Sequence, residues 1–450
     1  MYQVKPRNRR MRLKQLLLLN IVIIFNPVSS VSQEIYNLSD FITTGMEHNF
    51  ALQIARNRQD ITDNNFTPGN AGFFPVIDLS TRQSGTVNSS WQSFQDGGSA
   101  SNLGIHNTAT NAGINLGWNL FSGFRVRTTY NRLEEMKAQG ELSTRLAIER
   151  FIAQITSEYY NFIQQTRQLQ NLTYAVSLSK ERYRIDEERY NIGSGSRLQL
   201  LQSRVFLNAD SSRLSRQYEV LRASQIRLNE LVGAEDFDVL IGVRDTIILV
   251  DRGLAYDELL ESTLENNVGL LMAVSSHTIS EYDRDIIASR TYPFVNFNTG
   301  YGYTFNTYQS GSLSNQHSLG FSYGLTVGIN IFDGFNRRRE ISNALIEIRN
   351  RELSYMQVVQ EAKADLMTIY RAYENNLRLL ELEYQNLETA RENMEIAFER
   401  YRLGVLAGIE LREVQKSLLE AEERLLSIQY QTKIAEISLL QLSGRIMEYL

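Results

Sequence analysis

Side chains that could carry out chemistry are few in this chain of 450 residues, and they are scattered. Cysteine is absent, which excludes disulfides, thiolate metal ligands, cysteine nucleophiles and a lipid-bearing N-terminal cysteine. The four histidines lack the spacing of metal ligands; they are His48, His106, His277 and His317. No nucleophile–base pair or phosphate-binding loop is recognisable in the sequence. A secreted enzyme is therefore disfavoured, and we expect neither a cofactor nor a resident metal.

Charge and proline content narrow the choice further. The formal net charge of -5 gives no reason to expect a nucleic-acid partner. The chain has five prolines, at positions 6, 27, 68, 75 and 293. Proline interrupts helices and central strands, so its absence between residues 76 and 292 and after 293 permits very long elements.

The N-terminus has the pattern of an export signal. Basic residues within 9–14 precede an apolar run at 16–25, and small residues follow at 30–32. The alternative is a membrane anchor, but an apolar run of about ten residues is too short to span a bilayer as a helix. We therefore predict that residues 1–32 are a cleaved signal peptide, and we expect the mature protein to have no transmembrane helix.

The rest of the chain contains two copies of the same sequence pattern. Residues 119–124 (N-L-F-S-G-F) recur 211 positions later as residues 330–335 (N-I-F-D-G-F). The same offset pairs residues 188–193 with residues 399–404. Up to Pro75 the offset is 218, which places a seven-residue length difference in a loop. A fixed offset over so long a stretch indicates an internal duplication.

We divide the mature chain into a first repeat at 33–233, a linker at 234–255 and a second repeat at 256–450. Each repeat is expected to begin with one helix. In the first repeat it runs from an N-cap near Ser39 to about residue 65, and in the second from about 256 to 288.

Alternating residues predict two long strands in each repeat, at about 74–90 and 108–122, and at about 291–306 and 317–333. One face of these strands is rich in Tyr, Phe and Trp, and the other carries Gly, Ser, Asn and Thr. A soluble sandwich produces similar alternation. The length of the strands and their aromatic face favour a lipid-facing wall around a wet lumen. The segments at 92–107 and 306–316 are expected to be exposed loops.

Four strands cannot close a membrane barrel, because the smallest such barrels need about eight strands. Open strand edges are not tolerated in lipid, so membrane strands in this chain require a barrel shared between copies. Two copies would supply eight strands and three copies twelve. The strand count leaves both sizes open.

A very long helix is expected after the second strand of each repeat, at about 123–193 and 334–404. About sixty-five residues at 1.5 Å each give a length of roughly 100 Å. Apolar residues at heptad-like spacing predict that these helices pack as coiled coils with the helices that follow them. The returning helices are expected to end at Gly233 and Gly444, and the helical part of the second repeat is expected to reach about residue 447.

Local signals flank these helices. Gly193 and Gly404 stand where a left-handed helix end is needed. Ser196 and Gln199 have capping-box spacing at the start of the first returning helix. In the linker, residues 239–241 and 247–250 are apolar, which predicts short strands packed against the helices.

In these features the sequence resembles the TolC family of outer-membrane efflux channels. The resemblance rests on the duplication, the F-S/D-G-F junction, the R-Y-x-hydrophobic-G tip and the L-x-x-L-x-G helix ends, which occur in the same order in both copies. It implies a trimer with a twelve-stranded outer-membrane barrel, four strands from each protomer. The helices of such a channel continue as an α-helical coiled-coil barrel across the periplasm.

The resemblance also implies a periplasmic aperture at the helix tips. The family often places acidic residues six and nine positions after the tip glycine of the second repeat, and these positions are Glu410 and Glu413 here. The matching residues of the first repeat are Gln199 and Gln202. Tyr401 matches a tyrosine that latches the closed tip. Where the family has an arginine, this chain has Leu406, so the ion-pair part of the latch is in question. The alternative for the two glutamates is a solvated helix face.

The tip turns are the expected adaptor-docking surface; they comprise Gly193, Ser194, Gly195, Ser196, Gly404, Val405, Leu406, Ala407 and Gly408. The expected function is a passive outer-membrane exit channel of a tripartite efflux or type I secretion system in a diderm bacterium. Its partners would be a periplasmic adaptor, an inner-membrane pump of RND, ABC or MFS type, and outer-membrane lipid. The alternative is a periplasmic coiled-coil scaffold without a pore, which would not explain the four long strands.

Overall fold

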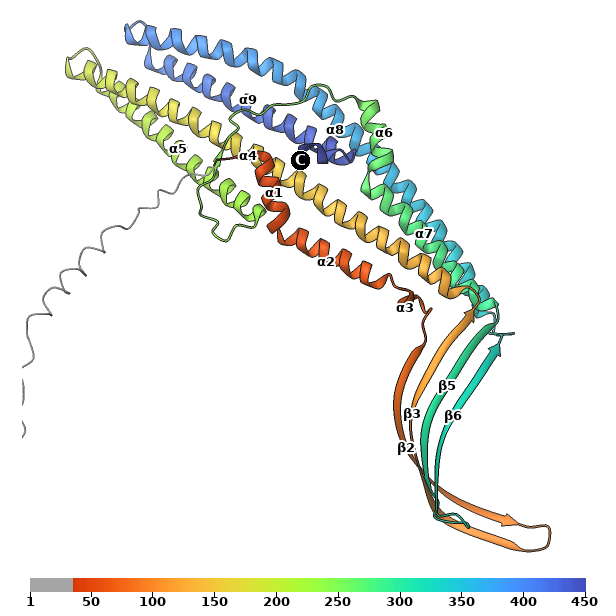
Figure 1. The fold of residues 1–450 in the computed structure, drawn as a ribbon. Coiled ribbons are helices and arrows are strands. Elements are labelled where there is room, and N and C mark those ends of the chain that lie inside the picture. The colour runs from red at the N-terminus through yellow and green to blue at the C-terminus, as the bar shows by residue number, and fades with distance from the viewer. Residues whose placement is uncertain (1–34) are drawn as a thin grey trace, which may run out of the picture.

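The structure of the protein, a computed structural model, describes residues 35–450, and the predicted signal peptide lies outside the described residues. Long helices occupy one part of the molecule and a curved sheet the other (Figure 1). The first repeat consists of β1 (Ile35–Tyr36), α1 (Leu38–His48), α2 (Phe50–Asn65), α3 (Pro68–Ala71), β2 (Val76–Ser93), β3 (Ser99–Ser122), α4 (Arg125–Asn191) and α5 (Arg197–Val232). The linker contains β4 (Gly242–Val243). The second repeat consists of α6 (Tyr256–Asn266), α7 (Val268–Ala288), η1 (Ser289–Thr291), β5 (Phe294–Thr307), β6 (Asn315–Gly328), α8 (Asn336–Arg402), α9 (Gly408–Leu442) and η2 (Ile446–Tyr449).

The long strands of both repeats join in one antiparallel sheet with the order β2-β3-β5-β6. The repeats meet where β3 pairs with β5, and Gly113 lies opposite Gly302 at this seam. β2 and β6 form the two edges of the sheet. On β6, Leu319, Tyr323 and Leu325 are between 62% and 78% exposed. The sheet therefore presents apolar side chains that no other part of residues 35–450 covers.

The strand limits differ from those predicted. β3 begins at Ser99 rather than near 108, so the first hairpin loop is far shorter than the predicted 92–107. Its polar residues still pair along the backbone with β2, because pairing does not require apolar side chains. β6 ends at Gly328 rather than at 333, since its partner β5 begins at Phe294, which lies opposite Gly328.

A pair of left-handed residues connects each second strand to its long helix. Gly123 and Phe124 have φ angles of 65° and 69°, and their counterparts Gly334 and Phe335 have 68° and 64°. A Cβ atom on Gly123 would lie 2.2 Å from the carbonyl oxygen of Ser289, so no larger residue fits there. The F-S/D-G-F motif therefore encodes the turn from strand to helix.

The two long helices, α4 and α8, have 67 residues each, which corresponds to roughly 100 Å. α5 and α9 return beside them, and α9 also packs against α4 (Figure 1). The predicted apolar seam is confirmed: Ile152, Ile155 and Tyr159 of α4 have no exposed surface. The two coiled coils therefore share buried surfaces within one chain.

The helix expected at the start of each repeat is in fact two helices. In the first repeat, Asn37 rather than Ser39 caps α1, and Asn49 separates α1 from α2. The Asn49 side chain caps α2, and its amide nitrogen donates to the carbonyl oxygen of Leu231 at 3.0 Å. In the second repeat, Asn267 likewise caps α7 and donates to the carbonyl oxygen of Leu442 at 2.8 Å.

The linker and the C-terminal helix also differ from the prediction. Residues 239–241 and 247–250 are not strands; the linker strand is β4, which pairs in parallel with β1. Ile241 and Ile248 are buried in the helical core instead, so their apolar character reflects burial rather than pairing. α9 ends at Leu442, just before the predicted Gly444, where the chain turns with a φ of 71°. The helix does not continue to 447, because residues 446–449 form the separate η2.

Candidate functional site

The two tip turns lie beside each other at the end of the molecule farthest from the sheet (Figure 1). Gly193 and Gly404 adopt left-handed φ angles of 79° and 81°, as the sequence predicts. The backbone nitrogens of Ser194 and Gly195 donate to the Arg189 carbonyl oxygen, and Val405 donates in the same way to Arg400. Both turns therefore end their long helices by the same backbone pattern.

The side chains of Gln199 and Glu410 close the start of the returning helices. Gln199 accepts from the Ser196 nitrogen at 3.1 Å, which completes the predicted capping box. At the equivalent place in the second repeat, Glu410 accepts from the Ala407 nitrogen at 3.2 Å. A carboxylate is favourable there because the helix N-terminus carries partial positive charge. Glu410 and Glu413 are both exposed, so neither side chain packs in the interior of the chain.

Tyr401 links the two coiled coils at the tip. Only 2% of the residue is exposed, and its hydroxyl donates to Asp186 Oδ1 on α4. Burial, together with the neighbouring Asp186 carboxylate, raises the pKa of Tyr401 to about 12, so the phenol keeps its proton. From the same helix, Arg189 donates to the Tyr401 carbonyl oxygen at 2.6 Å and lies 4.9 Å from the ring centroid.

Asp186 and Arg189 are not among the site residues predicted from the sequence, although a signal for Asp186 exists. The offset of 211 places Ala397 at its position in the second repeat. An acidic residue at a buried position that holds alanine in the other copy is a local departure from the duplication. Such a departure marks a contact that only one of the two copies makes.

A second polar contact joins the coiled coils farther from the tip. Arg412 on α9 donates to both carboxylate oxygens of Asp210 on α5, at 2.7 and 3.0 Å. Asp210 also accepts from the Ser179 hydroxyl, which in turn accepts from the Gln415 amide. Asp210 is buried, so the bidentate pairing supplies the partners that a buried carboxylate needs. The sequence reasoning did not identify this group.

A cavity of about 590 Å³ separates the two tip turns. Its lining includes three of the expected aperture residues, namely Gln199, Gln202 and Tyr401. Arg182 and Arg189 also face it, whereas Glu410 and Glu413 do not line it. The structure therefore brings the first-repeat glutamines together with Tyr401 and leaves the two glutamates outside.

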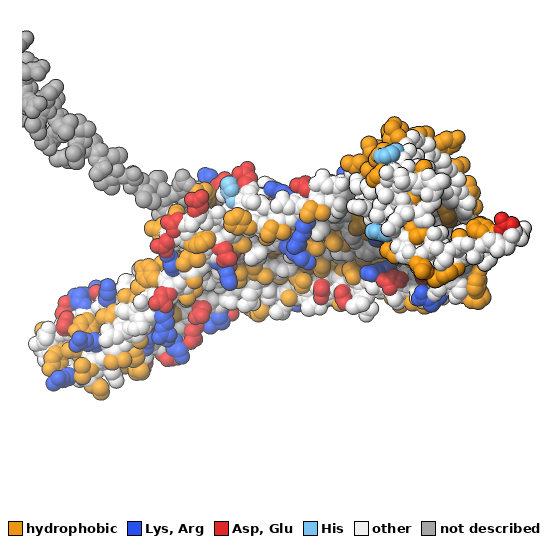
Figure 2. All heavy atoms as spheres, turned by 90° about the horizontal axis from the view of Figure 1, so that it is seen from below, with side chains coloured by type: hydrophobic (Ala, Val, Ile, Leu, Met, Phe, Trp, Pro, Cys, Tyr) orange, Lys and Arg blue, Asp and Glu red, His pale blue; other side chains and the backbone are white. Residues whose placement is uncertain are grey.

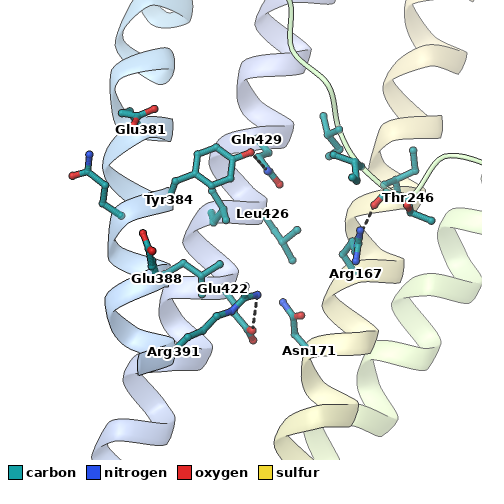
Figure 3. A pocket seen from close by; sticks show the side chains of 16 residues that line it. Arg167, Asn171, Thr246, Glu381, Tyr384, Glu388, Arg391, Glu422, Leu426 and Gln429 are labelled. Carbon is teal, nitrogen blue, oxygen red and sulfur yellow. Dashed lines mark hydrogen bonds and ion pairs between the residues drawn. The ribbon is translucent and has the colours of Figure 1, made fainter. Parts of the chain in front are cut away.

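A larger cavity, of about 730 Å³, lies between α4, α8, α9 and the linker (Figure 3). Glu422 is buried beside it, with Oε1 3.6 Å from the Arg391 guanidinium. Glu422 Oε2 has no hydrogen-bond partner among the described residues. Burial raises the pKa of Glu422, and Arg391 opposes this effect. On the opposite wall, Arg167 donates to the Thr246 carbonyl oxygen at 2.6 Å.

Within residues 35–450, no group of three or more histidine, aspartate or glutamate side chains could hold a metal ion. None of the helices in this part of the chain is long and apolar enough to cross a membrane. The arrangement at the tip holds helices together through buried polar contacts.

The sequence of the chain matches a known protein family. Residues 43–234 and 259–445 match the family described as outer membrane efflux protein, one segment for each repeat. The chain belongs to the outer membrane efflux protein family. This confirms the relation to TolC-like channels, and members of the family are channels rather than enzymes. No curated protein sequence matches the chain.

Solved outer-membrane channels share the fold of this efflux protein. The CmeC channel of Campylobacter jejuni is 16% identical with a TM-score of 0.74, and the match covers 91% of this chain and 85% of CmeC. VceC of Vibrio cholerae is 17% identical with a TM-score of 0.72, and the match covers 90% of this chain and 96% of VceC. The open state of Neisseria gonorrhoeae MtrE is 17% identical with a TM-score of 0.68, covering 91% of this chain and 89% of MtrE.

Proposed function

We propose that three copies of this chain form one passive exit channel of a tripartite efflux or type I secretion system. Their twelve strands would close a barrel in the outer membrane, and their helices would continue as a tube through the periplasm. An inner-membrane pump would supply the energy, and a periplasmic adaptor would join the pump to the helix tips. Substrates would pass through the channel without chemical change.

The open four-stranded sheet carries this proposal. Its edges, β2 and β6, each have one free side within the described part of the chain, and its apolar side chains are exposed. Figure 2 shows hydrophobic and uncharged surface at the sheet end, while Lys, Arg, Asp and Glu lie mainly over the helices. In lipid the apolar face is favourable, but open backbone edges are not. Pairing β6 of one copy with β2 of the next removes both open edges and leaves the apolar face toward lipid.

The helical part supports the periplasmic half of the proposal. Helices of roughly 100 Å, joined as coiled coils, suit a rigid extension rather than a membrane-embedded segment. We assign the two tip turns, residues 193–196 and 404–408, as the surface that meets the adaptor. In a trimer, Glu410 and Glu413 would form two rings of three carboxylates, which attract cations. Tyr401 and Asp186 would hold the aperture closed.

Export to the outer membrane would depend on residues 1–32 as a cleaved signal. The sequence contains no cysteine, so lipidation at an N-terminal cysteine is not part of the proposal. The pump is proposed to be of RND, ABC or MFS type.

Engineered disulfides across the strand edges test the shared barrel. Because the chain has no cysteine, each introduced thiol can be followed without background. One cysteine replaces Ser80 on β2, and the other replaces Ser318, Ser322 or Thr326 on β6 to cover different registers. At least one pair is expected to give a covalent trimer, with three times the mass of the mature monomer, in membranes under oxidising conditions.

Single-cysteine variants are the matched control, since one thiol per chain can join two copies at most. A ladder ending at the dimer in every register would indicate a different oligomer. A protein that stays water-soluble and monomeric without detergent would favour the periplasmic scaffold instead.

A further inference from the structure

The tip cavity is lined by a buried arginine, Arg182, and two of its three nitrogen donors have no hydrogen-bond partner among the described residues. Arg182 on α4 is 3% exposed, and its Nε and Nη1 have no hydrogen-bond partner among the described residues. Its guanidinium lies 5.0 Å from the Phe206 ring centroid and 5.9 Å from that of Tyr401. Aromatic faces stabilise the cation but accept no conventional hydrogen bond. Buried donors without acceptors are costly, so an acceptor that reached these two nitrogens would be stabilising.

The nearby carboxylate of Asp186 does not accept a hydrogen bond from Arg182. Asp186 Oδ2 lies 3.9 Å from Arg182 Nε, beyond hydrogen-bond distance, and Asp186 Oδ1 accepts from Tyr401 instead. Arg189 adds a second positive charge to the lining of the same cavity. Two guanidinium groups therefore face one carboxylate, which leaves one positive charge in excess.

The neutral lining groups are suited to an anion as well. Gln199 uses its oxygen to accept from the Ser196 nitrogen, which leaves its amide nitrogen as a donor. Gln202 and Ser194 contribute further polar side chains to the cavity. A cavity of about 590 Å³ has space for a small organic molecule.

We propose that the cavity between the tip turns binds a small monocarboxylate, with its carboxylate at Arg182 and Arg189. A single negative charge matches the single excess positive charge, whereas a dianion would leave an uncompensated charge. Guanidinium groups match the planar, two-oxygen geometry of a carboxylate. The occupant lies between α4, the start of α5 and the turn before α9, so it fixes the two coiled coils relative to each other.

Isothermal titration of the purified, full-length protein in detergent tests binding directly. The probe is sodium butyrate, with sodium chloride at equal ionic strength as the background. Butyramide is the matched control ligand, because it has nearly the same shape without the charge. We expect saturable heat from butyrate, none from butyramide, and weaker binding of inorganic phosphate. Equal heats from butyrate and butyramide would overturn the site, and tighter binding of phosphate would overturn the monocarboxylate assignment.

Variants locate the site. Arg182→Gln and Arg189→Gln are each expected to weaken butyrate binding by about tenfold or more, since each loses a charged hydrogen bond. Arg184→Gln is the matched control, because Arg184 lies on the same helix but is exposed and pairs with Glu181 and Glu188. If Arg182→Gln does not assemble, Arg189→Gln still decides the question. Unchanged affinity in the assembled arginine variants would refute the proposal.

A bilayer measurement separates this site from the proposed channel function, on which any effect on gating rests. With the wild-type protein, butyrate is expected to lower the open fraction, and with Arg189→Gln it should not. Heat of binding without any channel activity would refute the proposed channel function and would still support the binding site. Channel activity without charge-dependent heat would refute the site alone.

Discussion

Tyr401 and Asp186 lie 215 positions apart in the sequence and form a hydrogen bond in the interior of the tip. The bond joins α8 of the second repeat to α4 of the first. The duplicated positions do not repeat it, because Tyr190 is 41% exposed and Ala397 stands where the acid would be. The Tyr401–Asp186 hydrogen bond is therefore an asymmetric contact between the repeats and has no symmetric counterpart.

Tyr401→Phe should weaken closure of the tip. The substitution keeps the ring but leaves Asp186 buried without its hydroxyl donor, at a cost of about 1–3 kcal/mol. We expect a higher open fraction in planar bilayers. Tyr190→Phe is the matched control, since Tyr190 is the repeat equivalent and is exposed. Identical single-channel records for the two variants would show that this bond does not control opening.

Glu410→Gln combined with Glu413→Gln should reduce cation selectivity. Glutamine at 410 can still accept from the Ala407 nitrogen, as Gln199 does in the first repeat, so the helix cap is kept. Loss of six carboxylates in a trimer is expected to lower the cation-to-anion permeability ratio at least about twofold. The measurement is the reversal potential across a salt gradient. Glu420→Gln, an exposed change on α9, should leave that potential unchanged; a ratio unaltered in the tip variant would disprove the ring assignment.

Glu422→Gln should stabilise the protein at neutral and alkaline pH. The pKa of Glu422 is raised above its ordinary 4.5, so the folded state favours the protonated form and stability is lost as pH rises through the folded pKa. Glutamine removes this loss, and we expect Tm to rise by about 1–3 °C at pH 8, with little change near pH 4. Glu423→Gln is the control because Glu423 is its exposed neighbour. A rise in Tm of the same size at both pH values would contradict the burial effect.

Asn49→Ala and Asn267→Ala should destabilise the two repeats similarly. Each asparagine caps a helix and donates to the end of a returning helix, so each loss is expected to cost about 1–2 kcal/mol. Scanning calorimetry should show a lower Tm for either variant. Asn208→Ala, an exposed change within α5, provides the comparison. If only one of the two asparagines matters, the repeats are not energetically equivalent.

The duplication, the long helices and the tip turns could be predicted from the sequence because each has a local cause. Gly193 and Gly404 are needed for left-handed turns, and Ser196 with Gln199 forms a capping box wherever the rest of the chain goes. The F-S/D-G-F motif was visible as a repeat, and the structure supplies its physical reason in the φ angle of Phe124.

Features that depend on distant partners could not be predicted in this way. The break at Asn49 reflects an acceptor on Leu231, and the end of β6 depends on where β5 begins. Residues 239–241 were predicted as a strand because burial and strand pairing favour the same residue types. Asp186 differs in the sequence from its repeat equivalent Ala397, but only the structure shows that its partner is Tyr401.

The unequal hairpins also have a mechanical consequence. Residues 99–107 of β3 pair with β2 alone, because the seam with β5 starts at Thr108. This part of the first hairpin is a ribbon with one partner on each strand, and such ribbons are only marginally stable. Hydrogen bonds with Gln309 and Ser310, each involving a side chain, are its links to the second hairpin among the described residues. We therefore expect its amides to exchange with heavy water before those at the seam.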